Sequence, residues 1–228
     1  MRKPIWGAVA LMMLVSAGIG LLAGRLLIKP AGHSEQALGT SAVPAWMVED
    51  MRERLDTSLR SRVMPDRIHV MTLPPVTQNQ STSQPVDLAG SLTLDGEKGL
   101  FVVYASEDGD YQPAYSKNEP LFSLQQAGGG YLVVTTVKPA SHGQERTLYV
   151  LRKTSSGYQE VWSGVAAYRH KQGETTELLD GTVQIDPRRH TMIYFQLERT
   201  LDQTGFSLME KSSYELLRYN ERSNRFEK

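Results

Sequence analysis

Residues 101–115 read FVVYASEDGDYQPAY: an apolar run, a polar turn, and a second run that opens on an aromatic residue. The Asp108-Gly109 pair at the turn is typical of a tight hairpin, which joins two antiparallel strands. The same order of strand, polar turn and aromatic residue returns at residues 149–162 and, in a shorter form, at residues 216–226. Three hairpins of this kind predict an antiparallel β structure.

Apolar and polar side chains alternate from Val86 onward, and no long helical stripe follows. Polar and glycine clusters divide this region into strands, which we expect at residues 86–94, 99–105, 120–125, 131–138, 146–153, 158–163, 178–185, 190–199 and 213–219. The Asp180-Gly181 pair leaves open a division of one strand into two. We predict a mainly β fold, with residues 86–228 forming an antiparallel β-sandwich or barrel-like meander, because a closed propeller needs more blades than this length provides.

A short amphipathic helix is expected before the β region, from Pro44 to about Val63. Proline is favoured at a helix start, where its missing N–H would have no partner anyway. Apolar residues recur at every fourth position and form one stripe, made of Met47, Met51, Leu55, Leu59 and Val63. We interpret the segment as a helix that docks on the β domain, with a dimerising stalk as the alternative. Together with a short strand at residues 67–73, it makes up a unit spanning residues 44–73.

The N-terminal segment indicates a membrane anchor, because no side chain between Lys3 and Arg25 is charged. At a rise of about 1.5 Å per residue, an apolar helix of about 20 residues crosses the hydrocarbon core of a bilayer. We predict that residues 1–29 form a cytoplasmic tip and a transmembrane helix, which contacts the lipid bilayer through residues 5–24. A cleaved signal peptide is the alternative, but this apolar run is long for one and lacks a good cleavage site.

The flanking charges of the anchor slightly favour a cytoplasmic N-terminus. The C-terminal domain would then be periplasmic or extracellular, most simply in a single-pass protein of a bacterial inner membrane. Residues 30–43 are expected to form a flexible stem, and residues 74–85 a disordered linker, because these stretches offer little to bury. A stripe of small residues in the anchor, which leaves a homodimer open, consists of Ser16, Gly20 and Gly24.

The chain of 228 residues carries 25 basic and 25 acidic side chains and no cysteine. This neutral balance gives no electrostatic reason to expect a nucleic-acid partner. The absence of cysteine excludes disulfides, thiolate zinc sites and thiol nucleophiles. The five histidines are scattered, and the local motifs of zinc proteases and serine hydrolases do not occur. We therefore assign no catalytic residue, no metal site and no cofactor.

Tyrosine and tryptophan are concentrated in the middle of the β region. Both are enriched in binding patches, because they combine a large rigid area with a polar group. The residues predicted to bind a partner are Tyr111, Tyr115, Tyr158 and Trp162. The alternative is that they are ordinary strand residues packed on a half-buried sheet.

These patterns together predict a membrane-anchored extracytoplasmic β-rich module that binds another envelope component, with an envelope protein as the expected partner. Tethering to the membrane raises the effective concentration near such a partner. One alternative is an envelope hydrolase whose site is assembled from loops, with Glu107, Asp110 and His142 as candidate groups. A sensor or protective inhibitor domain is the other.

Overall fold

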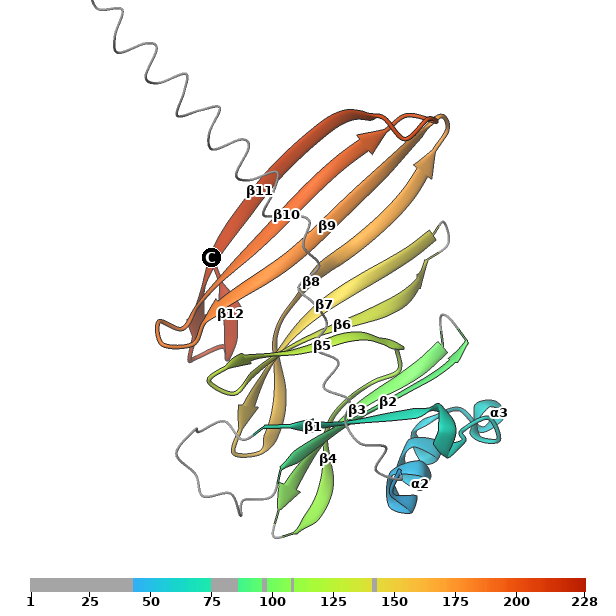
Figure 1. Cartoon of the computed structure of the whole chain (residues 1–228). Helices are drawn as coiled ribbons and strands as arrows, with labels where there is room; N and C mark the ends of the chain where they lie inside the picture. Colours follow the sequence, from blue (N-terminus) through green and yellow to red (C-terminus); the bar gives the residue numbers. More distant parts are fainter. Residues whose placement is uncertain (1–42, 75–85, 96–97, 108, 141–142) are drawn as a thin grey trace, which may run out of the picture. The chain divides into compact units, whose positions relative to one another are not determined.

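The computed structural model describes residues 43–74, 86–95, 98–107, 109–140 and 143–228. The predicted transmembrane helix lies outside these residues, as do nearly all of the predicted stem and linker. Among the helices that are described, none has the length and apolar character needed to cross a membrane. The described residues form a mainly β structure with two antiparallel sheets and few helices (Figure 1).

The range expected to form one helix contains two. Helix α2 spans Ala45–Arg54, helix α3 spans Thr57–Arg60, and a short 3₁₀ helix follows at Pro65–Arg67. The chain turns extended at Leu55, with φ −92° and ψ 155°, which ends α2. The apolar stripe still faces the β structure, because its members Met47, Met51, Leu55 and Val63 are buried there. The segment therefore docks on the first sheet.

The first sheet, here called the small sheet, has the strand order β1-β2-β3-β4. Its strands are β1 (Ile68–Leu73), β2 (Asp87–Asp95), β3 (Lys98–Glu107) and β4 (Asp110–Lys117). Strand β1 pairs with β2 along its whole length, so residues before and after the predicted linker share one sheet. Gly90 on β2 makes room for α2, since a Cβ there would lie 2.5 Å from the Met51 Cε.

The second sheet, here called the large sheet, runs in the order β5 to β12, so each strand pairs with its neighbour in the sequence. Its strands are β5 (Leu121–Gly128), β6 (Tyr131–Ala140), β7 (Gly143–Thr154), β8 (Gly157–Gln172), β9 (Thr175–Asp186), β10 (Thr191–Leu201), β11 (Ser207–Asn220) and β12 (Arg225–Glu227). The three hairpins expected from the sequence are all present, as β3–β4, β7–β8 and β11–β12. Short turns between neighbours make antiparallel pairing the natural result.

The Asp180-Gly181 pair does not divide a strand, because it lies inside β9. Gly181 stands opposite Gln196 on β10. A Cβ on Gly181 would lie 2.2 Å from the Val165 carbonyl oxygen and 3.0 Å from the Tyr194 hydroxyl. The glycine therefore serves a close approach of neighbouring strands rather than a turn.

The two sheets share one hydrophobic core, here called the junction core. From the small sheet it takes Leu73, Ala89, Phe101 and Val103, and from the large sheet Leu132, Val134, Tyr149, Leu151 and Tyr158. The opposite face of the large sheet has a separate core, here called the inner core, which includes Val150, Met192, Tyr194, Leu217 and Phe226. Strand β12 contacts β8 as well as its partner β11, so the large sheet curls around this inner core.

A buried carboxylate joins the two sheets beside the junction core. Asp87 at the start of β2 is 4% exposed, yet it accepts the Tyr158 hydroxyl at 2.8 Å and the Ser106 backbone N–H at 3.1 Å. The Lys153 ammonium at the end of β7 also bonds this carboxylate. A buried charge is tolerated only when it is paired and hydrogen-bonded, and here the donors come from both sheets.

Replacing Asp87 by Asn should weaken this connection while keeping the size of the side chain. We expect Asp87→Asn to lower the free energy of unfolding by about 2–4 kcal/mol, because it removes the charge paired with Lys153 and weakens the acceptor of two hydrogen bonds. Urea unfolding followed by circular dichroism measures the change. The matched control Asp95→Asn removes an exposed carboxylate paired with Arg62 and should have a much smaller effect. Equal losses in the two variants would contradict the role of Asp87.

The close approach at Gly181 gives a second prediction. We expect Gly181→Ala to destabilise the chain by about 1–3 kcal/mol, because its Cβ meets backbone rather than a movable side chain. The control Thr182→Ala changes the next, exposed residue of β9 and should leave the unfolding midpoint nearly unchanged. A Gly181→Ala variant as stable as this control would show that the strands are not so close.

Candidate interaction surface

Tyr111 packs against helix α2 and not with the other predicted binding residues. Its ring stacks on Trp46 of α2, with ring centroids 5.3 Å apart and an angle of 9° between the planes. Trp46 also makes an edge contact with Tyr104, at 5.0 Å between centroids. Tyr111 thus helps to attach the helix to the small sheet.

Tyr115 and Tyr158 lie together at the junction core. The Tyr115 hydroxyl donates to Glu160 at 3.2 Å, and the Tyr158 hydroxyl donates to Asp87. Burial is the main cause that raises the pKa of each phenol, and the neighbouring carboxylates add to it. Both phenols therefore stay protonated and act as hydrogen-bond donors between the sheets.

Trp162 lies on the other face of the large sheet, against the inner core. Its ring makes an edge contact with Tyr194, at 4.8 Å between centroids, and lies over Gly164. The structure therefore brings Tyr115 and Tyr158 together but places Tyr111 and Trp162 elsewhere. A binding role for these four residues stays a prediction, and they do not form one patch.

A polar network continues from Tyr115 along the margin of the junction core. Glu119, whose side chain is 17% exposed, accepts the hydroxyls of Thr136 and Tyr149, the latter at 3.1 Å. Lys117 pairs with Glu160 at 3.0 Å and lies 4.4 Å from the centre of the Tyr149 ring. Burial first, and the Glu119 carboxylate second, raise the pKa of the Tyr149 phenol. Each carboxylate is thus held by phenol, hydroxyl or ammonium groups, an arrangement that fixes strands in place.

The groups considered for a hydrolase are not brought into a protected site. Glu107 and Asp110 stand opposite each other beside the β3–β4 turn, and both are exposed. His142 lies outside the described residues. The part of the chain that the structure describes contains no group of three or more potential metal ligands.

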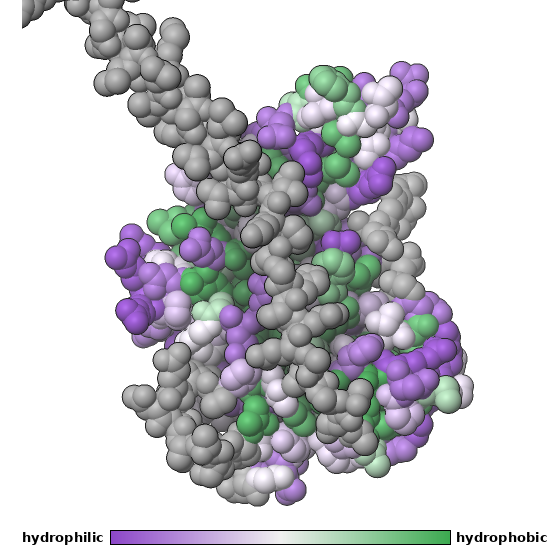
Figure 2. All heavy atoms as spheres, viewed as in Figure 1, coloured by the Kyte–Doolittle hydropathy of each residue, from purple (hydrophilic) through white to green (hydrophobic). Residues whose placement is uncertain are grey.

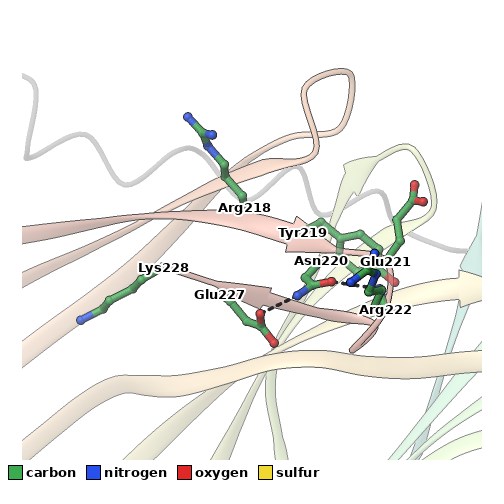
Figure 3. Close-up of a pocket in the computed structure, with 7 residues that line it drawn as sticks. All are labelled: Arg218, Tyr219, Asn220, Glu221, Arg222, Glu227 and Lys228. Carbon is green, nitrogen blue, oxygen red and sulfur yellow. Dashed lines mark hydrogen bonds between the residues drawn. The ribbon is translucent and has the colours of Figure 1, made fainter.

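A shallow hollow lies at the β11–β12 hairpin (Figure 3). It is lined by Arg218, Tyr219, Asn220, Glu221, Arg222, Glu227 and Lys228. Asn220 donates to Glu227 at 2.8 Å and accepts the Arg222 backbone N–H at 2.9 Å, which closes the turn. Hydrogen bonds from Ser223 and Asn220 lower the pKa of the Glu227 carboxyl. Figure 3 shows Arg218 pointing away from Asn220 and Glu227, so the polar groups that line the hollow do not converge on a common point.

An exposed apolar surface lies on β10 and β11. Met192, Tyr194 and Leu217 point into the inner core, so the residues that alternate with them point to the other side of the sheet. These are Ile193, Phe195, Tyr214 and Leu216, here called the β10–β11 face. Ile193 stands opposite Leu216, and Phe195 stands opposite Tyr214. Three of the four are well exposed, at 40% for Ile193, 51% for Leu216 and 74% for Tyr214.

The turn between β10 and β11 and the start of β11 expose further apolar residues. Phe206 is 68%, Leu208 57% and Met209 54% exposed. Asp202 shapes the turn by accepting the backbone N–H groups of Thr204 at 2.8 Å and Phe206 at 2.9 Å. Hydrogen bonds from Thr204 and Phe206 lower the pKa of the Asp202 carboxyl. Figure 2 shows hydrophobic surface among polar residues at the upper end of the view, where β8 to β11 reach in Figure 1.

Comparisons with known proteins find no matching family model, no matching curated protein and no matching solved structure. The predicted binding residues come from the middle of the β region, where tyrosine and tryptophan are concentrated, so they do not include the β10–β11 face. A signal was present, since the run from Met192 to Phe195 is apolar at every position and so offers apolar groups to both faces of its strand.

The buried tyrosines predict how stability depends on pH. Tyr115, Tyr149 and Tyr158 have raised pKa values in the folded chain, whereas in the unfolded chain each ionises near its ordinary value of about 10. Their contribution to stability is therefore fully present below about pH 10 and is lost as the pH rises toward the folded values. We expect the free energy of unfolding, measured in urea, to fall steadily above about pH 10.

The variant Tyr149→Phe should show a flatter fall, because one of the shifted phenols is absent. The matched control Tyr214→Phe removes an exposed hydroxyl and should follow the unmodified chain. If Tyr149→Phe loses stability with pH as steeply as the control, the phenol of Tyr149 is not linked to folding.

Proposed function

We propose that this chain is a membrane-anchored interaction module whose β10–β11 face binds another protein of the cell envelope, without catalysis of its own. The exposure of Ile193, Tyr214 and Leu216 on one side of a well-formed sheet carries the proposal. Contiguous apolar surface is uncommon on soluble monomers, and where it occurs it often marks a site of protein association. Aromatic residues such as Tyr214 are among those that contribute most to such contacts.

We also propose that the chain is anchored in the membrane by its N-terminal segment. The uncharged stretch between Lys3 and Arg25 supports a single-pass anchor that contacts the bilayer through residues 5–24. With the N-terminus in the cytoplasm of a bacterial cell, the β domain lies on the periplasmic side of the inner membrane. Attachment to the membrane confines the module near its partner, so a small interface is sufficient.

We infer that this domain is a β-sandwich, because its two sheets pack against each other across the junction core. The large sheet also curls around its own inner core, which resembles the way a barrel begins to close. In this proposal the junction core holds the large sheet at β6 to β8, and β10 and β11 present the binding face.

Site-specific crosslinking tests the proposed function. A photoreactive amino acid at position 214 of the full chain, expressed in its own cells, should give one discrete crosslinked protein of the envelope. The control position Ser155 lies in an exposed turn of the β7–β8 hairpin and should not give it. Adding Ile193→Ser and Leu216→Ser should reduce the product at least about tenfold, because each removes apolar area from the contact.

The crosslinked protein is then purified and tested for direct binding to the unmodified chain and to the double variant. Binding that is lost with the double variant supports the proposal. Crosslinking at position 155 equal to that at 214, or binding unaffected by the two serines, would overturn it. Thermal unfolding of the double variant guards against loss of the fold, which these exposed substitutions should preserve.

A further inference from the structure

Arginine side chains gather at one end of the large sheet. Thr191 at the start of β10 pairs with Arg218 of β11, and next to this pair the Tyr219 backbone N–H donates to the His190 carbonyl oxygen at 2.9 Å. The turn between β9 and β10 therefore lies beside the β11–β12 hairpin. The two turns and their neighbouring residues carry five exposed arginines, here called the basic end: Arg188, Arg189, Arg218, Arg222 and Arg225.

A sixth arginine lies next to the same hairpin. Arg152 on β7 places its guanidinium carbon 4.4 Å from the centre of the Tyr219 ring. A contact between a cation and an aromatic face holds the guanidinium without neutralising its charge. Arg152 therefore adds a positive charge in a fixed position beside the basic end.

The positive charges of the basic end are mostly not paired. Among the described residues, only Arg189 of these five arginines forms an ion pair, with Asp186 at 3.7 Å, which is longer than a hydrogen bond. Arg218 stands opposite Glu227 in the β11–β12 pairing, but Figure 3 shows its side chain pointing away from that carboxylate. The guanidinium groups are thus free to meet an external anion.

Carboxylates are fewer at this end than arginines. Those of the two turns and their neighbouring residues are Asp186, Glu221 and Glu227. Six arginines against three carboxylates leave an excess of three positive charges, and the neighbouring Lys228 is paired with Glu215. Residues 87–228 carry 16 basic and 19 acidic side chains in all, so the rest of this region is acidic. Charge of one sign concentrated at one place attracts a partner of the opposite sign.

We propose that the basic end binds the phosphate groups of an anionic lipid bilayer. Arginine suits phosphate because its planar guanidinium can donate two parallel hydrogen bonds. The arginines do not converge on one point, so they are poorly placed to hold a single small anion together. The many headgroups of a bilayer can meet each guanidinium separately, and clustered basic residues are attracted to anionic lipids. The choice of a bilayer rests on the anchor in the proposed function, which keeps the domain close to lipid.

This contact would orient the large sheet on the membrane surface. The two turns expose no large apolar side chain, so binding is electrostatic and involves no insertion into the hydrocarbon. Strand β10 has 11 residues and is about 36 Å long, with the basic end at its start and the turn around Phe206 after its end. Binding at the basic end therefore leaves the exposed apolar residues around Phe206 away from the lipid.

Binding to added vesicles tests the proposal with the full chain. The chain is reconstituted in nanodiscs of phosphatidylcholine alone, which hold the predicted anchor and offer no anionic lipid. Vesicles are then added and pelleted, and the chain in the pellet is measured. We expect vesicles with equal parts of phosphatidylglycerol and phosphatidylcholine to pellet at least tenfold more chain than vesicles of phosphatidylcholine. Raising NaCl from about 50 mM to about 500 mM should remove this difference, because salt screens exposed charges.

Two triple variants locate the binding surface. The test variant replaces three arginines of the basic end: Arg218→Gln, Arg222→Gln and Arg225→Gln. It should pellet at least tenfold less with the anionic vesicles. The control variant replaces three exposed cations elsewhere on the large sheet: Arg169→Gln, Lys171→Gln and Lys211→Gln. The control should bind like the unmodified chain, since the two variants have the same net charge and differ only in location. Thermal unfolding shows that both are folded.

Equal pelleting with the two kinds of vesicle, or equal loss in the two triple variants, would overturn the proposal. Arginine-dependent binding of polyglutamate without binding of anionic vesicles would also overturn it, because the basic end would then fit an acidic protein. If the chain stays in solution without detergent, the proposed anchor is wrong, and the same vesicles are offered to the free chain. Failure of the β10–β11 face to bind an envelope protein is recognised separately, by the missing crosslink at position 214.

Discussion

The carboxylate of Asp87 holds together the two sheets on which the rest of the structure depends. It is buried at the start of β2, and its partners Lys153 and Tyr158 flank the turn of the β7–β8 hairpin. Because a buried charge without partners is costly, the sheets are favoured in the one arrangement that brings these donors to it. The junction core beside it supplies the non-directional attraction, while the carboxylate and the network around Glu119 and Glu160 supply the specific geometry.

The small sheet packs on one side of the large sheet at β6 to β8, and the same side of the sheet looks different at β10 and β11. The small sheet covers the outward side of β7, where Tyr149 and Leu151 are buried. On β10 and β11 the corresponding side carries apolar residues such as Leu216 that remain exposed. Within the part of the chain that the structure describes, β12 is the strand paired with the outer edge of β11, and it covers only residues 218–220. The exposed apolar surface on this sheet is the physical basis of the proposed binding function.

The sequence predicted the strands well where alternation and turn residues agree, as in the β3–β4 and β7–β8 hairpins. It predicted the ends of β8 and β11 poorly, because residues 164–172 and 207–212 have no clear alternation and are strands through pairing with their neighbours. The Asp180-Gly181 pair left a turn open, because the sequence around Gly181 does not show that its backbone lies close to Val165 of the neighbouring strand. The role of Asp87 could not be predicted for the same reason. Its hydrogen-bond donors Lys153 and Tyr158 lie 66 and 71 residues away in the sequence, so only the fold brings them together.

Hydrogen–deuterium exchange of the full chain tests most directly whether the β10–β11 end of the large sheet is the binding surface. The exchange is compared between native membranes and the dilute purified chain in detergent. Backbone amides of residues 207–217 should exchange more slowly in the membrane, because a partner covers the edge and face there. Amides of β6 and β7 should be equally protected in both samples, since their contacts lie within the chain. Equal exchange of residues 207–217 in the two samples would contradict the account.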